Sequence, residues 1–219
     1  MTVPKIKAVA FDMDGLMFNT EDLYDQVGEL LLQRRGQHFT RELKLEMMGL
    51  PGLVAFEVMR NRCRLSESVE ELQSETDEIF RDFLPGNIAT MPGLEKLLET
   101  LEGLAIPKAV ATSSHRKFAT RALGFFQLEP RFEFVLTAED VTNGKPAPEV
   151  YLAAADRFEI DPTNMLVLED SRTGSRAAAS AGAYTIAVPT SHSEGQDFSH
   201  VHQIATRLDD EIILELFRV

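Results

Sequence analysis

Short runs of apolar residues alternate along this chain with longer stretches of helical periodicity. The runs are apolar at nearly every position, which is typical of strands buried on both faces of a parallel sheet. Five strands are predicted in this way: Ile6–Phe11, Lys108–Thr112, Phe134–Thr137, Met165–Leu168 and Thr185–Val188. The helices predicted between them are Leu94–Glu102, His115–Phe126, Glu149–Phe158 and Ser175–Ala181. The alternation therefore predicts an α/β fold with a doubly wound parallel sheet.

The connection after the first predicted strand departs from this alternation. Residues 18–89 show helical periodicity and no convincing strand, and the α/β pattern resumes only at Met91. Within this insert, Ser68 and Glu71 have the spacing of a capping box, which predicts a helix that continues to Phe83. We therefore predict a core domain formed by residues 1–17 and 90–219 and a helical cap domain formed by residues 18–89. Such an insert is well placed to act as a lid, although a purely structural bundle remains an alternative.

The charge and the cysteine content restrict the partners and the compartment. The chain has 35 acidic and 22 basic residues, and its net charge of −13 repels the phosphates of nucleic acids and anionic lipids. We expect no nucleic acid and no membrane partner, and a monomer or a weak dimer. Cys63 is the only cysteine, and no apolar run reaches membrane-spanning length. A reducing compartment and a cytoplasmic protein are therefore expected.

Two carboxylates follow the first predicted strand. Asp12 and Asp14 lie two positions apart, so their side chains are expected on the same face, and Gly15 allows the chain to turn sharply after them. Paired carboxylates at the carboxyl end of a buried strand indicate a hard cation, acid–base chemistry, or both.

The other strand ends carry polar groups as well. Thr112, Ser113 and Ser114 follow the second strand and could form an anion cradle, although N-capping by Ser114 alone is an alternative. Lys145 lies after the third strand in a loop that Pro146 stiffens. The fourth strand ends in Glu169 and Asp170, which need a cation partner near a buried edge unless they only cap the next helix. Since the carboxyl ends of parallel strands meet at one edge, these groups together predict phosphoryl transfer.

Four segments of this chain resemble the four motifs of the haloacid dehalogenase superfamily of phosphotransferases. They are Phe11–Leu16, Ala111–Ser114, Gly144–Pro148 and Glu169–Gly174. The resemblance covers nearly the whole chain and is strongest to the β-phosphoglucomutase-like branch, including its pseudouridine monophosphatase-like members. It implies a Rossmann-like core with a small helical cap inserted after the first strand.

The resemblance also implies a role for each motif residue. Asp12 would be the nucleophile that forms an aspartyl-phosphate, and Asp14 the general acid and base. A Mg²⁺ ion would be held by Asp12, the backbone carbonyl of Asp14, Asp170 and, directly or indirectly, Glu169. Thr112 and Lys145 would act on the phosphoryl group. The remaining positions implied to contact phosphate or substrate are Met13, Ser113, Ser114, Tyr24 and Gly49.

The resemblance leaves the reaction open between hydrolysis and mutase chemistry. Related mutases carry an arginine just beyond the position of Gly49 that grips a second phosphate, whereas residues 50–53 here are neutral. We therefore favour a phosphatase that acts on a small phosphorylated metabolite, with a sugar phosphomutase as the alternative because Arg60 or Arg64 could replace the missing arginine. Phosphonate cleavage needs a lysine in the cap that forms a Schiff base. Lys44 is the only lysine there, and we disfavour this reaction. A non-catalytic phosphate-binding module is disfavoured because all the motif residues are present.

Two segments near the C-terminus are predicted to have structural roles. The polar stretch Ser191–Gln203 contains three histidines without the spacing of a metal site, and we predict a mobile surface loop. The acidic segment Leu208–Leu216 predicts a terminal helix that covers the sheet.

Overall fold

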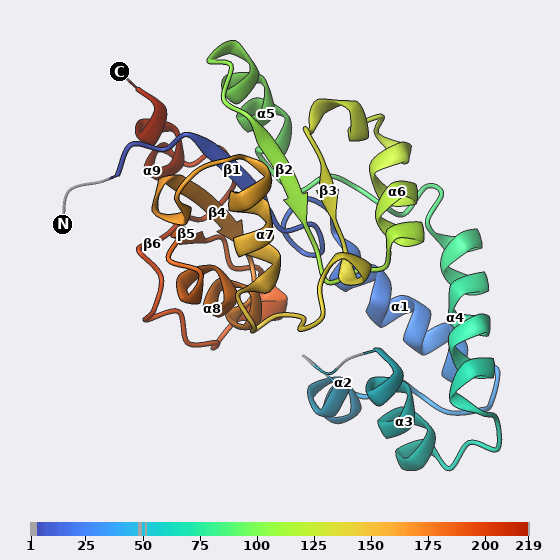
Figure 1. Cartoon of the computed structure of the whole chain (residues 1–219). Coiled ribbons are helices and arrows are strands. Elements are labelled where there is room, and N and C mark those ends of the chain that lie inside the picture. Colours follow the sequence, from blue (N-terminus) through green and yellow to red (C-terminus); the bar gives the residue numbers. More distant parts are fainter. Residues whose placement is uncertain (1–3, 48–49, 51, 219) are drawn as a thin grey trace. The chain divides into compact units, whose positions relative to one another are not determined.

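The computed structural model describes residues 4–47, 50 and 52–218 of the chain (Figure 1). These residues form two compact units. One consists of Met1–Asn19 together with Ala89–Val219, and the other consists of Thr20–Ile88. Among the described residues, no helix combines the length and the apolar character needed to cross a membrane.

The first unit is built on a six-stranded parallel sheet with the strand order β3-β2-β1-β4-β5-β6. The strands are β1 (Ala8–Phe11), β2 (Lys108–Ala111), β3 (Val135–Leu136), β4 (Met165–Glu169), β5 (Tyr184–Ala187) and β6 (Gln203–Ile204). The α-helices among the described residues of this unit are α5 (Leu94–Gly103), α6 (Arg116–Phe125), α7 (Glu149–Arg157), α8 (Arg172–Ser180) and α9 (Glu211–Leu214). The predicted α/β fold is confirmed, and each predicted strand is present to within two residues at either end.

The strand order reverses at β1. From β1 the chain proceeds outward through β2 to β3, and it then returns to place β4 on the other side of β1. Phe11 pairs with Val110 of β2 and with Leu168 of β4, so the residues that follow these three positions are level with one another. In sheets of this kind, ligands bind outside the carboxyl ends of the strands at the point of reversal.

Apolar side chains from alternate strand positions fix the helices to the sheet. Ala10 and Val167 face α7 and α8, which lie together over one face of the sheet (Figure 1). Phe11 faces the opposite side, where its ring meets that of Phe132 edge-on at 5.8 Å between centroids. Four small residues of α8 are buried and allow this helix to approach the strands closely: Gly174, Ser175, Ala177 and Ala178.

The stretch Ser191–Gln203 was predicted to be a mobile surface loop; most of it is irregular in the structure, and its mobility stays a prediction. This stretch contains the short 3₁₀ helix η4 (Ser191–Ser193) and ends in the edge strand β6. Two histidines tie it to the core, because His202 Nδ1 accepts from the Thr185 N–H at 3.1 Å and His200 Nε2 lies 2.9 Å from Ser175 Oγ. A two-residue strand carries no periodicity that a sequence pattern can reveal.

The described residues of the second unit form four helices: α1 (Thr20–Gln33), α2 (Arg41–Met47), α3 (Gly52–Cys63) and α4 (Val69–Phe83). The predicted capping box is confirmed, since the Glu71 N–H donates to Ser68 Oγ at 3.1 Å and the Ser68 N–H donates to the Glu71 carboxylate at 2.8 Å. Arg35, two residues beyond the end of α1, pairs with Glu75 on α4 and so connects this end of α1 to α4. In the first unit, the predicted terminal helix is present as α9, which is followed by the 3₁₀ turn η5 (Glu215–Phe217).

Candidate active site

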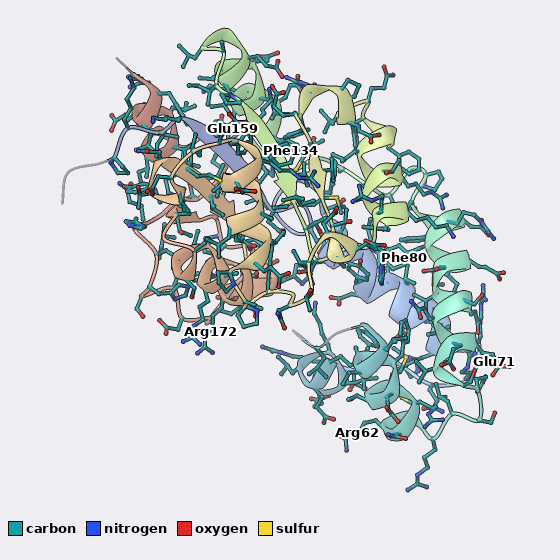
Figure 2. The ribbon with its side chains drawn as sticks, in the orientation of Figure 1. Arg62, Glu71, Phe80, Phe134, Glu159 and Arg172 are labelled. Carbon is teal, nitrogen blue, oxygen red and sulfur yellow. The ribbon has the colours of Figure 1, made fainter. Side chains whose placement is uncertain are left out.

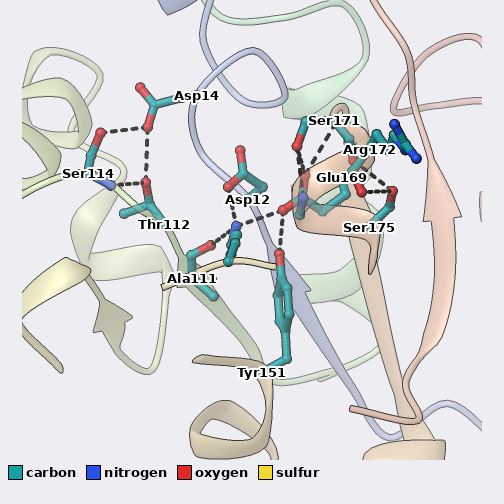
Figure 3. A network of polar contacts seen from close by, with 12 residues as sticks. Asp12, Asp14, Ala111, Thr112, Ser114, Tyr151, Glu169, Ser171, Arg172 and Ser175 are labelled. Carbon is teal, nitrogen blue, oxygen red and sulfur yellow. Dashed lines mark hydrogen bonds and ion pairs between the residues drawn. The ribbon is translucent and has the colours of Figure 1, made fainter. Parts of the chain in front are cut away.

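Three carboxylates gather at the carboxyl ends of β1 and β4, and two of them, Asp12 and Glu169, are labelled in Figure 3. Asp12 follows β1 directly, Glu169 is the last residue of β4, and Asp170 comes next. Each offers an oxygen, and these three oxygens all lie within 4.8 Å of one another. Asp12 and Asp170 are 5% exposed and Glu169 is fully buried. The strand register explains the arrangement, because Asp12 is level with Glu169 across the point of reversal.

Lys145 supplies the positive charge of this cluster. Its ammonium nitrogen lies 2.5 Å from Asp12 Oδ1, 2.7 Å from Glu169 Oε1 and 2.9 Å from the carbonyl oxygen of Ala111. These three acceptors come from three neighbouring strands at the same level, so a single nitrogen can reach all of them. The Lys145 side chain is only 5% exposed, so its ammonium group is held by these acceptors and not by solvent. The sequence prediction that this lysine is held in place agrees with these contacts.

Burial and charge act against each other in this cluster. Burial raises the pKa of the Asp12 carboxyl, the Glu169 carboxylate raises it further, and the Lys145 ammonium acts in the opposite direction. Burial alone would lower the pKa of Lys145, but the attraction of Asp12 and Glu169 outweighs it and raises that pKa. The cluster has more acid than base, so an additional cation would stabilise the ionised carboxylates.

Asp14 is held apart from this cluster, on the side of β2. Its Oδ2 atom accepts from Thr112 Oγ1 at 3.0 Å and from Ser114 Oγ at 2.8 Å (Figure 3). Gly15 has a φ of +79°, the left-handed conformation that only glycine adopts readily, and this allows the chain to turn away after Asp14. The side chain of Asp14 is not part of the three-carboxylate cluster, so a metal contact from this residue would come from its backbone.

The alternative role of Ser114 as a helix cap is wrong. The residue that precedes α6 is His115, and the N–H of Arg116 donates to both oxygens of Glu139 at 3.2 and 3.1 Å. A carboxylate from a neighbouring loop therefore occupies the N-terminus of α6, and the Ser114 hydroxyl is directed to Asp14 instead. Of the three residues of the predicted anion cradle, Thr112 and Ser114 both donate to Asp14 and Ser113 is exposed, and the binding of an anion by them stays a prediction. Nothing local in the sequence identifies Glu139, because its partner lies 23 residues away.

The alternative role of Glu169 and Asp170 as caps of α8 is also wrong, because Ser171 occupies the N-cap position and accepts from the Gly174 N–H at 3.1 Å. Ser171 Oγ also donates to Glu169 Oε2 at 3.0 Å. A Cβ atom on Gly174 would lie only 1.7 Å from Glu169 Oε1, so this position has no room for a side chain. Ser171 and Gly174 belong to the fourth motif, but the sequence alone did not assign them this role.

Three of the residues predicted to contact the substrate lie in different parts of the chain. Met13 is completely buried, so its side chain belongs to the core and only its backbone can meet a ligand. Tyr24 lies on α1 in the helical unit, where its ring packs edge-on against that of Phe80 at 4.8 Å between centroids. Phe80 belongs to α4 of the same unit and is labelled in Figure 2. Gly49 lies outside the described residues. The roles assigned to these positions stay sequence-based predictions.

The donor set fits a hard divalent cation. Carboxylate and carbonyl oxygens are the ligands that Mg²⁺ prefers, and the cluster offers three carboxylates within reach of one ion. Both oxygens of Glu169 already accept from Lys145 and Ser171. Asp12 and Asp170 are therefore better suited to coordinate the ion directly. Glu169 would then contribute its negative charge near the ion without being a ligand.

Comparison with known proteins agrees with this geometry. The family model described as haloacid dehalogenase-like hydrolase matches residues 9–188. A (DL)-glycerol-3-phosphatase of Arabidopsis thaliana is 35% identical over 213 residues, which cover 94% of this chain and 71% of the relative. A Drosophila melanogaster protein provisionally named pseudouridine-5′-phosphatase is 34% identical over 212 residues, which cover 94% of this chain and 91% of the relative.

The fold is also similar to solved structures. A Thermotoga maritima protein provisionally named β-phosphoglucomutase superposes with a TM-score of 0.80 at 28% identity. The alignment covers 96% of this chain and 98% of that one, so it includes both compact units.

Proposed function

Since this chain belongs to the haloacid dehalogenase-like hydrolase family, as its motifs predicted, we propose that it is a Mg²⁺-dependent phosphatase that forms an aspartyl-phosphate on Asp12. The phosphatase names of its relatives support hydrolysis of a phosphoric monoester. The observation that carries the proposal is the contact of one buried lysine with Asp12 and Glu169, beside Asp170.

In the first step an oxygen of Asp12 attacks the phosphorus atom of the substrate, and the bond from phosphorus to the leaving oxygen breaks. Asp14 gives its proton to that leaving oxygen. In the second step Asp14 removes a proton from water, the water oxygen attacks the phosphorus, and the bond to Asp12 breaks with release of inorganic phosphate. Thr112 and Ser114, which hold Asp14 in the structure, are placed to exchange that contact for the phosphoryl oxygens.

The main obstacle to the first step is electrostatic. Two unit charges 4 Å apart interact by about 4 kcal/mol at an effective dielectric constant of about 20, so a carboxylate that approaches a phosphate dianion is strongly repelled. Lys145 offsets this repulsion from its fixed position beside Asp12. A Mg²⁺ ion held by Asp12 and Asp170, with the Asp14 carbonyl and Glu169 as further candidates, would neutralise charge on the phosphoryl oxygens.

The substrate proposed is the phosphate monoester of a small polyol, sugar or nucleoside. The names of the two relatives given above refer to a phosphatase of glycerol phosphate and to one of a nucleoside monophosphate, so they include a polyol and a nucleoside ester. Sugar phosphomutase activity is the second candidate, because the structural match to a protein of that name extends over both units.

The neutral stretch around Leu50 and Leu53 disfavours the mutase, since a mutase must hold a second phosphate. Of the two arginines considered as replacements, Arg60 already forms an ion pair with Glu57 on the same helix, with 3.5 Å between the charged atoms.

A panel of phosphate esters, assayed for released phosphate with Mg²⁺ and with EDTA, tests the proposal. We expect Mg²⁺-dependent release from at least one ester and no release by Asp12→Asn. β-Glucose 1-phosphate separates the two candidates, because a phosphatase yields inorganic phosphate and a mutase yields glucose 6-phosphate. A wild-type chain that binds esters without turnover would instead indicate a non-catalytic phosphate-binding module.

A further inference from the structure

A buried tyrosine lies directly beneath the lysine of the site. Tyr151 is on the first turn of α7 and is completely buried. Its hydroxyl donates to Glu169 Oε1 at 2.7 Å, the same oxygen that accepts from Lys145 (Figure 3). Its ring centroid lies 4.9 Å from the Lys145 ammonium nitrogen, within the range of a cation–π contact. Tyr151 thus contacts both partners of the ion pair that Lys145 forms with Glu169.

The hydroxyl completes the set of donors around Glu169. One carboxylate oxygen accepts from Tyr151 and Lys145, and the other accepts from Ser171 Oγ at 3.0 Å. With Gly174 closing the remaining side, the carboxylate has a single orientation. Because a fully buried carboxylate is stabilised by each donor, removal of one would leave its charge less compensated.

Lys145 divides its attraction between two acids. Its nitrogen lies 2.5 Å from Asp12 and 2.7 Å from Glu169, so a small change in either acceptor shifts the balance between them. The hydroxyl of Tyr151 compensates part of the negative charge on Glu169 Oε1, the oxygen that also accepts from Lys145. Without that hydroxyl, the less compensated charge of Glu169 would draw Lys145 away from Asp12. Phenylalanine at position 151 would fill the same space but would not compensate this charge.

We propose that Tyr151 is a positioning residue, whose hydroxyl fixes Glu169 and so directs Lys145 to Asp12 and to the phosphoryl group. This inference rests on the proposed function, because it assigns Lys145 a part in phosphoryl transfer. It differs from a purely structural role for a core tyrosine in one respect. A packing defect would weaken every property of the site together, whereas loss of the hydroxyl alone changes Glu169 and the lysine and leaves Asp12 and Asp170, the two residues best suited to bind Mg²⁺ directly, in place.

The test compares Tyr151→Phe with Tyr184→Phe. Tyr184 is a matched control, because it is a buried tyrosine of the same unit whose hydroxyl pairs with Gln203 at the far edge of the sheet. Three quantities are measured for each variant: kcat and KM with the best ester of the panel, the Kd for Mg²⁺ by calorimetry on the substrate-free protein, and the Tm. For Tyr151→Phe we expect kcat to fall by about tenfold, with KM and the Mg²⁺ Kd within threefold of wild type. For Tyr184→Phe we expect no change in kcat.

The inference is overturned if kcat of Tyr151→Phe stays within threefold of wild type. It is equally overturned if KM rises or Mg²⁺ binding weakens by more than threefold, or if the variant does not fold, since each of these outcomes indicates a structural role. Absence of turnover in the wild-type chain has a different meaning, because it removes the proposed function itself. The two failures are therefore distinguishable from the wild-type assay alone.

Discussion

The ammonium nitrogen of Lys145 lies 2.5 Å from Oδ1 of Asp12, although the two residues are 133 positions apart in the chain. The contact exists because β1 lies between β2 and β4, where the loop that carries Lys145 reaches over the ends of all three strands. It places a fixed positive charge beside the proposed nucleophile before any substrate binds. Preorganised charge of this kind is the largest contribution to catalysis in many enzymes, because no reorganisation is needed during the reaction.

Replacement of Lys145 by methionine should lower kcat/KM by about 100-fold or more, the usual effect of removing one preorganised donor. Methionine has a similar length but cannot pair with Asp12 or Glu169. The measurement is steady-state turnover of the best ester at saturating Mg²⁺. Lys96→Met is the control, since Lys96 is a surface lysine whose side chain is 60% exposed, and its activity should equal that of wild type. Equal activity of Lys145→Met and Lys96→Met would remove Lys145 from the mechanism.

Replacement of Gly174 by alanine should disturb the site through Glu169. The added Cβ would lie 1.7 Å from the carboxylate, so Glu169 has to leave the position in which it holds Lys145. We expect at least a tenfold loss of kcat and a loss of about 2 kcal/mol in the free energy of unfolding. Gly124→Ala is the matched control, because Gly124 also lies in a helix and has no atom within 4 Å of the added Cβ. That control should keep full activity, and a similar loss in both variants would contradict the steric explanation.

Removal of metal should silence the enzyme reversibly. We expect EDTA to abolish turnover and Mg²⁺ to restore it, because three buried carboxylates face one another with a single lysine among them. Asp170→Asn should raise the Mg²⁺ concentration needed for half-maximal activity by about tenfold or more, since it removes one anionic ligand. Asp82→Asn, at an exposed position on the helical unit, should leave that concentration unchanged. Full activity in EDTA would contradict the metal assignment.

The stability of the core unit should depend on Glu102 in a defined pH range. Hydrogen bonds from Arg131 hold the pKa of Glu102 at about 2, below its ordinary value, and Lys108 contributes to the same effect. A depressed pKa stabilises the fold above the unfolded-state pKa, and this contribution is lost as the pH falls through about 2. Glu102→Gln should therefore lower the free energy of unfolding by about 1 kcal/mol at pH 7, after allowance for solvent screening.

Thermal melts of wild type and Glu102→Gln at several pH values check this expectation. The difference in Tm should be constant from pH 7 to about pH 5 and should shrink steadily below that. A difference that persists unchanged at the lowest pH at which both proteins fold would show that the ion pair is not its cause.

The sequence predicted the parts of the site that follow directly from strand ends. Asp12, Glu169 and Thr112 each come after an apolar run, and the carboxyl ends of parallel strands necessarily share one edge. Lys145 was predicted because a proline-rich loop follows the third strand. These inferences needed only local patterns together with the general rule for where the strands of such sheets end.

Other residues were missed because their roles depend on tertiary contacts. Tyr151 has the sequence environment of any core aromatic, and only the fold brings its hydroxyl to Glu169. Glu139 occupies the N-terminus of α6 from a separate loop, which a search for local caps cannot detect. The edge strand β6 is too short to produce a periodic signal. His200 and His202, which precede it, are explained only by their contacts with Ser175 and Thr185.

The most direct measurement of the central claim is the identification of the phosphorylated residue. The enzyme is quenched with acid during turnover and treated with borohydride, which reduces an aspartyl-phosphate to homoserine, and its peptides are mapped by mass spectrometry. The account predicts homoserine at position 12, dependent on Mg²⁺ and absent from wild type quenched without substrate. Reduction at another residue, or no reduction in an enzyme quenched while it is turning over under conditions that trap a known aspartyl-phosphate, would contradict it.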